Sequence, residues 1–217
     1  MDLTEALRTT GSAREFTDRA IDDATVAAIL DDARFAPSGG NRQPWRVAVV
    51  KNPTIRRQLA DLMTTVWQEY LGEETDKTRA PFAFGRSTGS PPVAAPNGLL
   101  DNVEQVPVML AVAANLNKIA LMDAEIAGRP PMTGGASIYP FGWSVLLAAR
   151  SRGLGGVMTT FLSRAEAQAA PILGLPKGHA LVATIFLGHP VHQNTKLRRN
   201  QVSEFASIDR FDGMPLT

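Results

Sequence analysis

The feature that most constrains the fold is a continuous apolar run from Val106 to Ala113. A strand with apolar residues on both faces must be covered on both faces, unlike a strand that alternates apolar and polar residues. Ala180 to Leu187 predicts a second strong strand, and Arg46 to Val50 predicts a short, mostly buried one. Helices covering a sheet of few strands define an α+β or mixed α/β fold class. The order of these segments does not fix the sheet topology.

Helical periodicity predicts the covering elements. Asp2 and Glu5 have capping-box spacing, which predicts a short first helix that ends by residues 9–11. Apolar residues recur on one face from Asp22 to about Phe35, and Asn52-Pro53 opens another amphipathic helix. Further helices are expected from Ile138 to Gly153, and from the capping-box pair Ser163 and Glu166. The segments 85–98 and 128–135 are expected to be irregular, and a polar tail follows Pro190, outside the core.

Composition limits the partners and the chemistry. The 217 residues predict a single domain, 1–217, and the 22 Lys and Arg against 21 Asp and Glu give a net charge of +1. With no block of like charge, we expect no nucleic-acid or membrane partner, but small molecules or copies of the chain itself. The absence of cysteine excludes disulfides and thiolate chemistry. No secretory signal or membrane-spanning stretch is visible, so a cytoplasmic protein is expected.

The loop from Ala36 to Trp45 is rich in glycine and amide side chains. Gly39 and Gly40 allow a backbone to approach a planar ligand, while the amides of Asn41 and Gln43 both donate and accept hydrogen bonds. An isoalloxazine ring needs this combination, because its polar edge alternates acceptors and donors. The alternative interpretation is a turn that carries Trp45 into a core.

Three other segments could contact the same ligand. Ser12 and Arg14 lie two residues apart, as do Lys196 and Arg198, so in extended chain each pair points the same way. Together they would suit a phosphate monoester, although ordinary surface charges are the alternative. The glycines of segment 153–160 could allow backbone amides to reach the edge of a ligand. The alternative is a helix end that runs into a strand, which explains Gly153 but not the glycine pair at 155–156.

In chain order, the motifs Ser-x-Arg-x-Phe (12–16), Ala-Pro-Ser-x-x-Asn-x-Gln-Pro-Trp (36–45), Gly-Leu-Gly (153–155) and Lys-x-Arg (196–198) resemble those of the nitroreductase family of FMN-dependent NAD(P)H oxidoreductases. The resemblance implies an α+β sandwich whose central mixed or antiparallel sheet is flanked by helices. It also implies an interwoven homodimer with FMN at the subunit interface.

The resemblance also implies roles for particular residues. The phosphate and ribityl chain would be held by Ser12, Arg14, Lys196 and Arg198. Residues approaching the same flavin from the second subunit would be Pro37, Ser38, Gly39 and Asn41, with Gln43 supporting the loop or the ring. Met158, Thr159 and Thr160 would lie along the ring near N5.

The mechanism that the resemblance implies rests on the cofactor. FMN would accept a hydride at N5 from NADPH or NADH and reduce a small acceptor such as a nitroaromatic or a quinone, with no catalytic side chain and no metal. Two alternatives remain open. One is a protein of the same fold that holds flavin without NAD(P)H turnover. The other is an enzyme that uses oxygen to convert reduced flavin into dimethylbenzimidazole.

The sequence departs from the family pattern just before Ser12. Many members carry two basic residues where this chain has Thr10 and Gly11. Losing one charge-assisted hydrogen bond costs roughly 1.5–3 kcal/mol, so FMN would bind about tenfold to a hundredfold more weakly unless Arg199 or Arg8 compensates.

Three rival motifs are weak. Residues 85–89 match the Gly-x-Ser-x-Gly pattern of a hydrolase, with Asp101 and His179 following, but Ser90-Pro91-Pro92 cannot directly begin the helix that such a nucleophile requires. His189 and His192 lack the further ligands of a metal site. Gly153-Leu154-Gly155 is not a dinucleotide fingerprint, because Met158 occupies the third glycine position.

Overall fold

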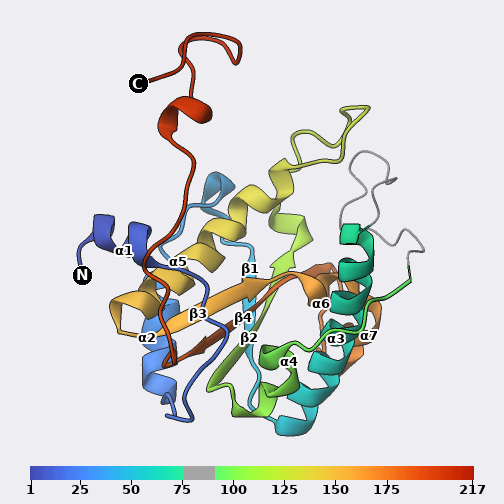
Figure 1. The fold of residues 1–217 in the computed structure, drawn as a ribbon. Coiled ribbons are helices and arrows are strands. Elements are labelled where there is room, and N and C mark those ends of the chain that lie inside the picture. Colours follow the sequence, from blue (N-terminus) through green and yellow to red (C-terminus); the bar gives the residue numbers. More distant parts are fainter. Residues whose placement is uncertain (76–90) are drawn as a thin grey trace.

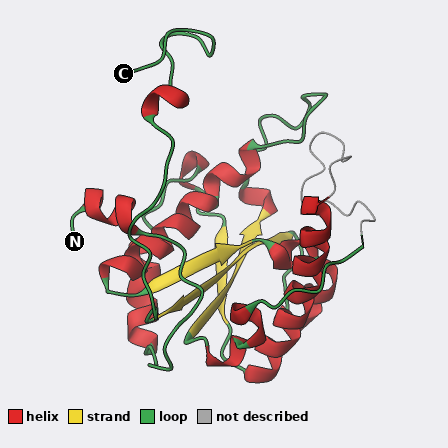
Figure 2. Cartoon of the chain, viewed as in Figure 1, coloured by secondary structure: helices red, strands yellow, loops and turns green. Residues whose placement is uncertain are grey.

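The computed structural model describes residues 1–75 and 91–217 and contains one four-stranded sheet (Figure 2). The strand order is β1-β2-β4-β3, and every neighbouring pair is antiparallel. The α+β class with a central antiparallel sheet flanked by helices is therefore confirmed. The strands are β1 (Trp45–Val49), β2 (Val108–Asn115), β3 (Gly155–Thr159) and β4 (His179–Gly188).

Helices cover both faces of the sheet (Figure 1). On β2, Leu110 and Val112 pack with α2 (Asp23–Ala33) and α5 (Tyr139–Ser151). Met109 and Ala111 belong to the core on the opposite face. This alternation explains why the predicted strand is apolar at every position. The opposite face is covered by α3 (Pro53–Thr75), α4 (Gly98–Asp101), α6 (Phe161–Arg164) and α7 (Glu166–Leu173).

Of the two helix caps predicted from capping-box spacing, the one at Asp2 is present, and Asp22 caps a further helix without having been predicted to do so. Asp2 Oδ1 accepts a hydrogen bond from Glu5 N–H at 2.8 Å before α1 (Leu3–Thr9), and Asp22 Oδ1 accepts one from Thr25 N–H at 2.7 Å before α2. The cap predicted at Ser163 is wrong. Ser163 lies inside α6, and α7 starts at Glu166 without a side-chain cap. The Glu166 carboxylate instead accepts a hydrogen bond from the Leu181 N–H of β4.

The irregular segments and the tail contain more structure than expected. The α4 turn begins at Gly98, and a 3-10 turn occupies Thr133–Ser137. The C-terminal tail leaves the body of the molecule, as Figure 1 shows, but it is not simply polar. It forms a 3-10 turn at Val202–Glu204, followed by a small hairpin in which Ser207 pairs with Pro215. Within residues 1–75 and 91–217, no helix is long and apolar enough to cross a membrane.

Candidate functional site

The two segments that carry the predicted phosphate residues lie side by side. Ala13 N–H donates to Gly156 O of β3 at 3.0 Å, which attaches the N-terminal segment to the edge of the sheet. On its other side, Thr17 N–H donates to His189 O at 2.9 Å, and Val191 N–H donates to Glu15 O at 3.0 Å. Segment 11–17 is therefore held between β3 and the chain that follows β4.

This pairing places four predicted residues on neighbouring outward faces. Ser12 and Arg14 are exposed, whereas Gly11 and Ala13 are buried, so the alternation expected of extended chain is present. Leu197 is half-buried against Gly11, with Lys196 and Arg198 exposed on either side of it. In the part of the chain that the structure describes, no hydrogen bond or ion pair occupies these four side chains. Three uncompensated cations and a hydroxyl form a donor set that fits a phosphate.

The glycine pair in segment 153–160 has a packing role. Gly155 and Gly156 lie within β3. A Cβ on Gly155 would lie 2.9 Å from both Ala13 Cβ and Gln193 Oε1, and a Cβ on Gly156 would lie 2.6 Å from Leu187 Cδ2. The close approach of the neighbouring segments therefore requires both glycines.

A cleft of about 690 Å³ opens where β3 ends. Its lining includes Arg14 and the predicted ring-contacting residues Met158, Thr159 and Thr160, so the structure brings these four together. Thr160 is exposed, whereas Met158 and Thr159 are half-buried. The cleft therefore has the guanidinium of Arg14 in one part of its lining. At the end of β3 it has the apolar side chain of Met158 and the hydroxyls of Thr159 and Thr160.

Aromatic side chains from two helices form another part of the cleft lining. Trp67 and Tyr70 come from α3, and Phe161 begins α6. The Phe161 ring centroid lies 5.8 Å from that of Trp67 and 6.0 Å from that of Tyr70. Sequence reasoning missed these residues because aromatics at helical spacing also fit a core. The signal that could have indicated them is the spacing of Trp67 and Tyr70, three residues apart on one helix.

The loop from Pro37 to Gln43 lies elsewhere on the same chain. Asn41 and Gln43 have φ values of 51° and 47°, a left-handed conformation that is uncommon outside glycine. The loop is held by Gly39 N–H donating to Ser137 Oγ at 3.0 Å, and by Gln43 Nε2 donating to Asn41 Oδ1 at 3.1 Å. No loop residue is among the described residues that line the cleft. One chain therefore does not bring Pro37, Ser38, Gly39, Asn41 and Gln43 together with Arg14.

The end of the motif has a structural role. Trp45 stacks on Phe141 of α5, with ring centroids 4.9 Å apart and planes inclined by 7°. Pro44 is buried, and its carbonyl accepts a hydrogen bond from Asn115 N–H at 2.8 Å. The turn interpretation is thus right for Pro44 and Trp45, which anchor the exposed, strained part of the loop.

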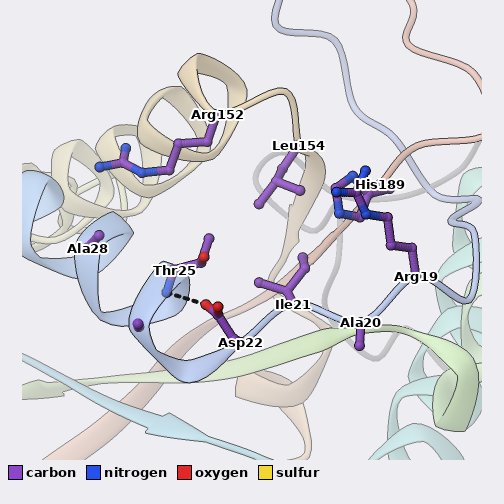
Figure 3. Close-up of a pocket in the computed structure, with 10 residues that line it drawn as sticks. Arg19, Ala20, Ile21, Asp22, Thr25, Ala28, Arg152, Leu154 and His189 are labelled. Carbon is purple, nitrogen blue, oxygen red and sulfur yellow. Dashed lines mark hydrogen bonds between the residues drawn. The ribbon is translucent and has the colours of Figure 1, made fainter.

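A second hollow of about 520 Å³ lies between the start of α2 and the end of β4 (Figure 3). Most of its charged groups are already used: Asp22 caps α2, and Arg152 pairs with Asp32 at 2.8 Å. Burial and the nearby Arg19 lower the pKa of His189, so its imidazole is neutral at pH 7. We assign no ligand to this hollow.

The rival motifs gain no support. Across residues 1–75 and 91–217, no cluster of three or more potential metal ligands occurs. Residues 85–89 lie outside the described residues. Of the two remaining hydrolase candidates, Asp101 Oδ2 accepts a hydrogen bond from Asn97 N–H at 3.0 Å, and His179 Nδ1 lies 3.2 Å from Lys177 O. Both side chains are engaged within their own turns.

An antiparallel sheet between two helix layers, with a cleft that combines a cation and aromatic walls, defines an α+β protein with a candidate ligand site. The profile of the Nitroreductase family matches residues 7–189, and the chain belongs to this family. Its family membership makes it an oxidoreductase by class.

Relatives within the family carry out different reactions. The chain is 25% identical over 208 residues to an NADH dehydrogenase of Thermus thermophilus, covering 84% of this chain and 83% of the relative. It is 29% identical over 180 residues to a 5,6-dimethylbenzimidazole synthase of Rhodospirillum rubrum, covering 82% and 76%. Its fold is similar to that of an iodotyrosine deiodinase bound to FMN and 3-iodo-L-tyrosine, with a TM-score of 0.69, 19% identity and coverage of 97% and 100%.

Proposed function

We propose that the chain is an FMN-dependent NAD(P)H oxidoreductase that reduces a small planar acceptor. The observation that carries this proposal is the pairing of segment 11–17 with the chain after β4, beside the cleft at the end of β3. This pairing places Arg14, Lys196 and Arg198 on adjacent outward faces. Among the described residues no carboxylate forms an ion pair with them, although Glu15 also lines the cleft. An FMN phosphate would supply the missing negative charge.

Each part of the site has its own task. Ser12, Arg14, Lys196 and Arg198 would bind the phosphate and ribityl chain, while Met158, Thr159 and Thr160 would lie along the ring. When bound, FMN supplies hydride-transfer chemistry between a nicotinamide and an acceptor. Trp67, Tyr70 and Phe161 give the cleft an aromatic lining that excludes water and favours stacking of a flat acceptor such as a nitroaromatic or a quinone.

We infer that the working unit is a homodimer. The loop from Pro37 to Gln43 and the cleft are separate on one chain, so a second subunit is needed if both are to reach one flavin. The C-terminal arm, residues 199–217, also extends from the body and exposes Phe205 and Met214 at 71% and 74% (Figure 1). Apolar side chains on an ordered, projecting segment are typical of a surface that a partner covers.

The first experiment is an absorbance spectrum of the purified protein, recorded before and after NADPH or NADH is added under nitrogen. Flavin bands that bleach support the proposed function. Bands that persist favour a protein that holds flavin without turnover, and a colourless protein that takes up no added FMN contradicts the proposal. The relatives that make 5,6-dimethylbenzimidazole favour one second candidate, which an aerobic incubation with FMN and NADPH tests by detecting that product.

A variant tests the phosphate assignment. Arg198→Ala should weaken FMN binding by about tenfold to a hundredfold, because a charge-assisted hydrogen bond to phosphate is lost. The exposed position of Arg198 predicts an unchanged thermal midpoint. FMN titration by fluorescence quenching measures the change, and an unaltered affinity would refute the assignment.

A further inference from the structure

The structure explains why neither residue before Ser12 can supply a phosphate cation. A Cβ on Gly11 would lie 2.5 Å from Asn194 O and 2.9 Å from Leu197 Cδ2, so a basic side chain has no room there. The Thr10 hydroxyl donates to Ala6 O at 2.7 Å and completes the end of α1. The C-terminal segment therefore occupies the space that a side chain at position 11 would need.

Another element brings a cation to the end of α1. Arg150 lies in the last turn of α5, and its Nη2 donates to the Thr9 hydroxyl at 3.4 Å, three residues before Ser12. Its Nε is buried and has no hydrogen-bond partner among the described residues. No carboxylate in residues 1–75 or 91–217 forms an ion pair with it, whereas Arg152, the C-cap residue of α5, pairs with Asp32.

A buried guanidinium nitrogen without an acceptor is costly, so the Arg150 guanidinium has hydrogen-bonding capacity that the described residues do not use. We propose that Arg150, acting from the end of α5, supplies the phosphate cation that Thr10 and Gly11 do not. This inference rests on the proposed FMN site and adds a binding residue to it.

The structure favours Arg150 over the two replacements suggested by the sequence. Arg8 is exposed on α1, and Arg199 donates from Nη1 to Arg198 O at 2.7 Å. Neither has a buried donor left without an acceptor. A purely structural role for Arg150 is the competing explanation, because a cation near the C-terminus of a helix stabilises the helix dipole.

The test compares FMN with riboflavin, which has the same ring and ribityl chain but no phosphate. Kd values for both flavins are measured by fluorescence quenching for the wild-type protein, Arg150→Gln and the matched control Arg152→Gln. We expect Arg150→Gln to raise the Kd for FMN about tenfold to a hundredfold and to leave the Kd for riboflavin within twofold. Arg152→Gln should keep the wild-type preference for FMN. Arg150→Lys, which keeps the charge, should retain part of the preference and serves as the folded variant if Arg150→Gln is unstable.

The outcomes separate this inference from the proposed function. If the wild-type protein prefers FMN and Arg150→Gln or Arg150→Lys keeps the full preference, the Arg150 assignment is overturned and the FMN site stands. Equal weakening of both flavins assigns Arg150 a structural role and also overturns it. A wild-type protein that binds neither flavin contradicts the proposed function itself.

Discussion

Gly11 shows how the absence of one side chain can set the packing of two segments. A methyl group added at this position would meet the backbone oxygen of Asn194 and Leu197 Cδ2, so Gly11→Ala must push the C-terminal segment away. We expect a loss of about 1–3 kcal/mol in the free energy of unfolding, as for other overpacked sites. FMN affinity should fall too, because Lys196 and Arg198 move with that segment. Urea unfolding and FMN titration measure the two effects.

Gly98→Ala is the matched control for this substitution. Nothing lies within 4 Å of a Cβ at position 98, so the same added methyl group should leave the free energy of unfolding nearly unchanged. If Gly11→Ala and Gly98→Ala were equally stable, the tight packing of the two segments would be refuted.

Asp123 makes a second prediction at the scale of one residue. Its buried carboxylate pairs with Arg129 and accepts hydrogen bonds from Met132 N–H and from the Thr133 N–H and hydroxyl. Arg129 first, and then these hydrogen bonds, hold the pKa of Asp123 far below its ordinary value of 3.8. Since the folded pKa is the lower one, the stabilisation is fully present above about pH 4 and is lost as the pH falls further.

Unfolding measured between pH 6 and pH 2 tests the contribution of Asp123. Asp123→Asn should be less stable than the wild-type protein at pH 6, and the difference should shrink as the pH falls. Glu125→Gln is the control on the same loop, since Glu125 is exposed and has no ion pair among the described residues. A difference for Asp123→Asn that stays constant with pH would contradict the assigned role.

At the scale of elements, the pattern of apolar residues predicted strands and helices whose apolar faces are buried in the fold. The run beginning at Val106 became β2, although the strand starts at Val108, just after Pro107, which has no N–H to donate to a ladder. Capping-box spacing predicted the cap at Asp2 correctly but not the one at Ser163, which lies inside α6. The pattern could not separate these cases, because the decisive hydrogen bond, from Leu181 to Glu166, joins residues far apart in the sequence.

Alanine substitutions at Ser163 and Asp22 should affect the free energy of unfolding differently, because Ser163 is not a helix cap and Asp22 is one. The Ser163 hydroxyl is buried and has no hydrogen-bond partner in the described part of the chain, so Ser163→Ala should be neutral or slightly stabilising. Asp22→Ala removes a real cap and should cost about 0.5–2 kcal/mol. Chemical denaturation of both variants makes the comparison, and a loss at Ser163 equal to that at Asp22 would restore the capping interpretation.

At the scale of the whole molecule, only part of the candidate site could be predicted from sequence. Ser12, Arg14, Lys196 and Arg198 belong to short motifs, and the fold places their segments in contact. The spacing of Trp67 and Tyr70 could indicate one aromatic helix face, but its contact with Phe161 was not predictable, because α3 and α6 meet only in the folded chain. Arg150 was missed for the same reason, since its neighbour Thr9 is 141 residues away in sequence.

The exposed apolar residues of the C-terminal arm provide the prediction for the assembly. The hairpin in the arm closes on itself, with Ile208 N–H donating to Met214 O and Leu216 N–H donating to Ala206 O, both at 2.9 Å. Phe205 and Phe211 are left exposed, and burying each against a partner would contribute about 1.5–3 kcal/mol.

The double variant Phe205→Ser/Phe211→Ser should therefore weaken a homodimer at least about tenfold while leaving the fold of each chain intact. Sedimentation velocity over a range of concentrations measures the change, and circular dichroism checks the fold. Asp212→Asn alters only an exposed ion pair with Arg210 on the same hairpin, so it should dissociate like the wild-type protein. Because the loop at Pro37–Gln43 and the cleft are separate on one chain, the double variant should also lose FMN affinity as it dissociates. If the double variant dimerises with the wild-type dissociation constant, the subunit contact lies elsewhere. If the wild-type protein is monomeric and still binds FMN, one chain completes the site.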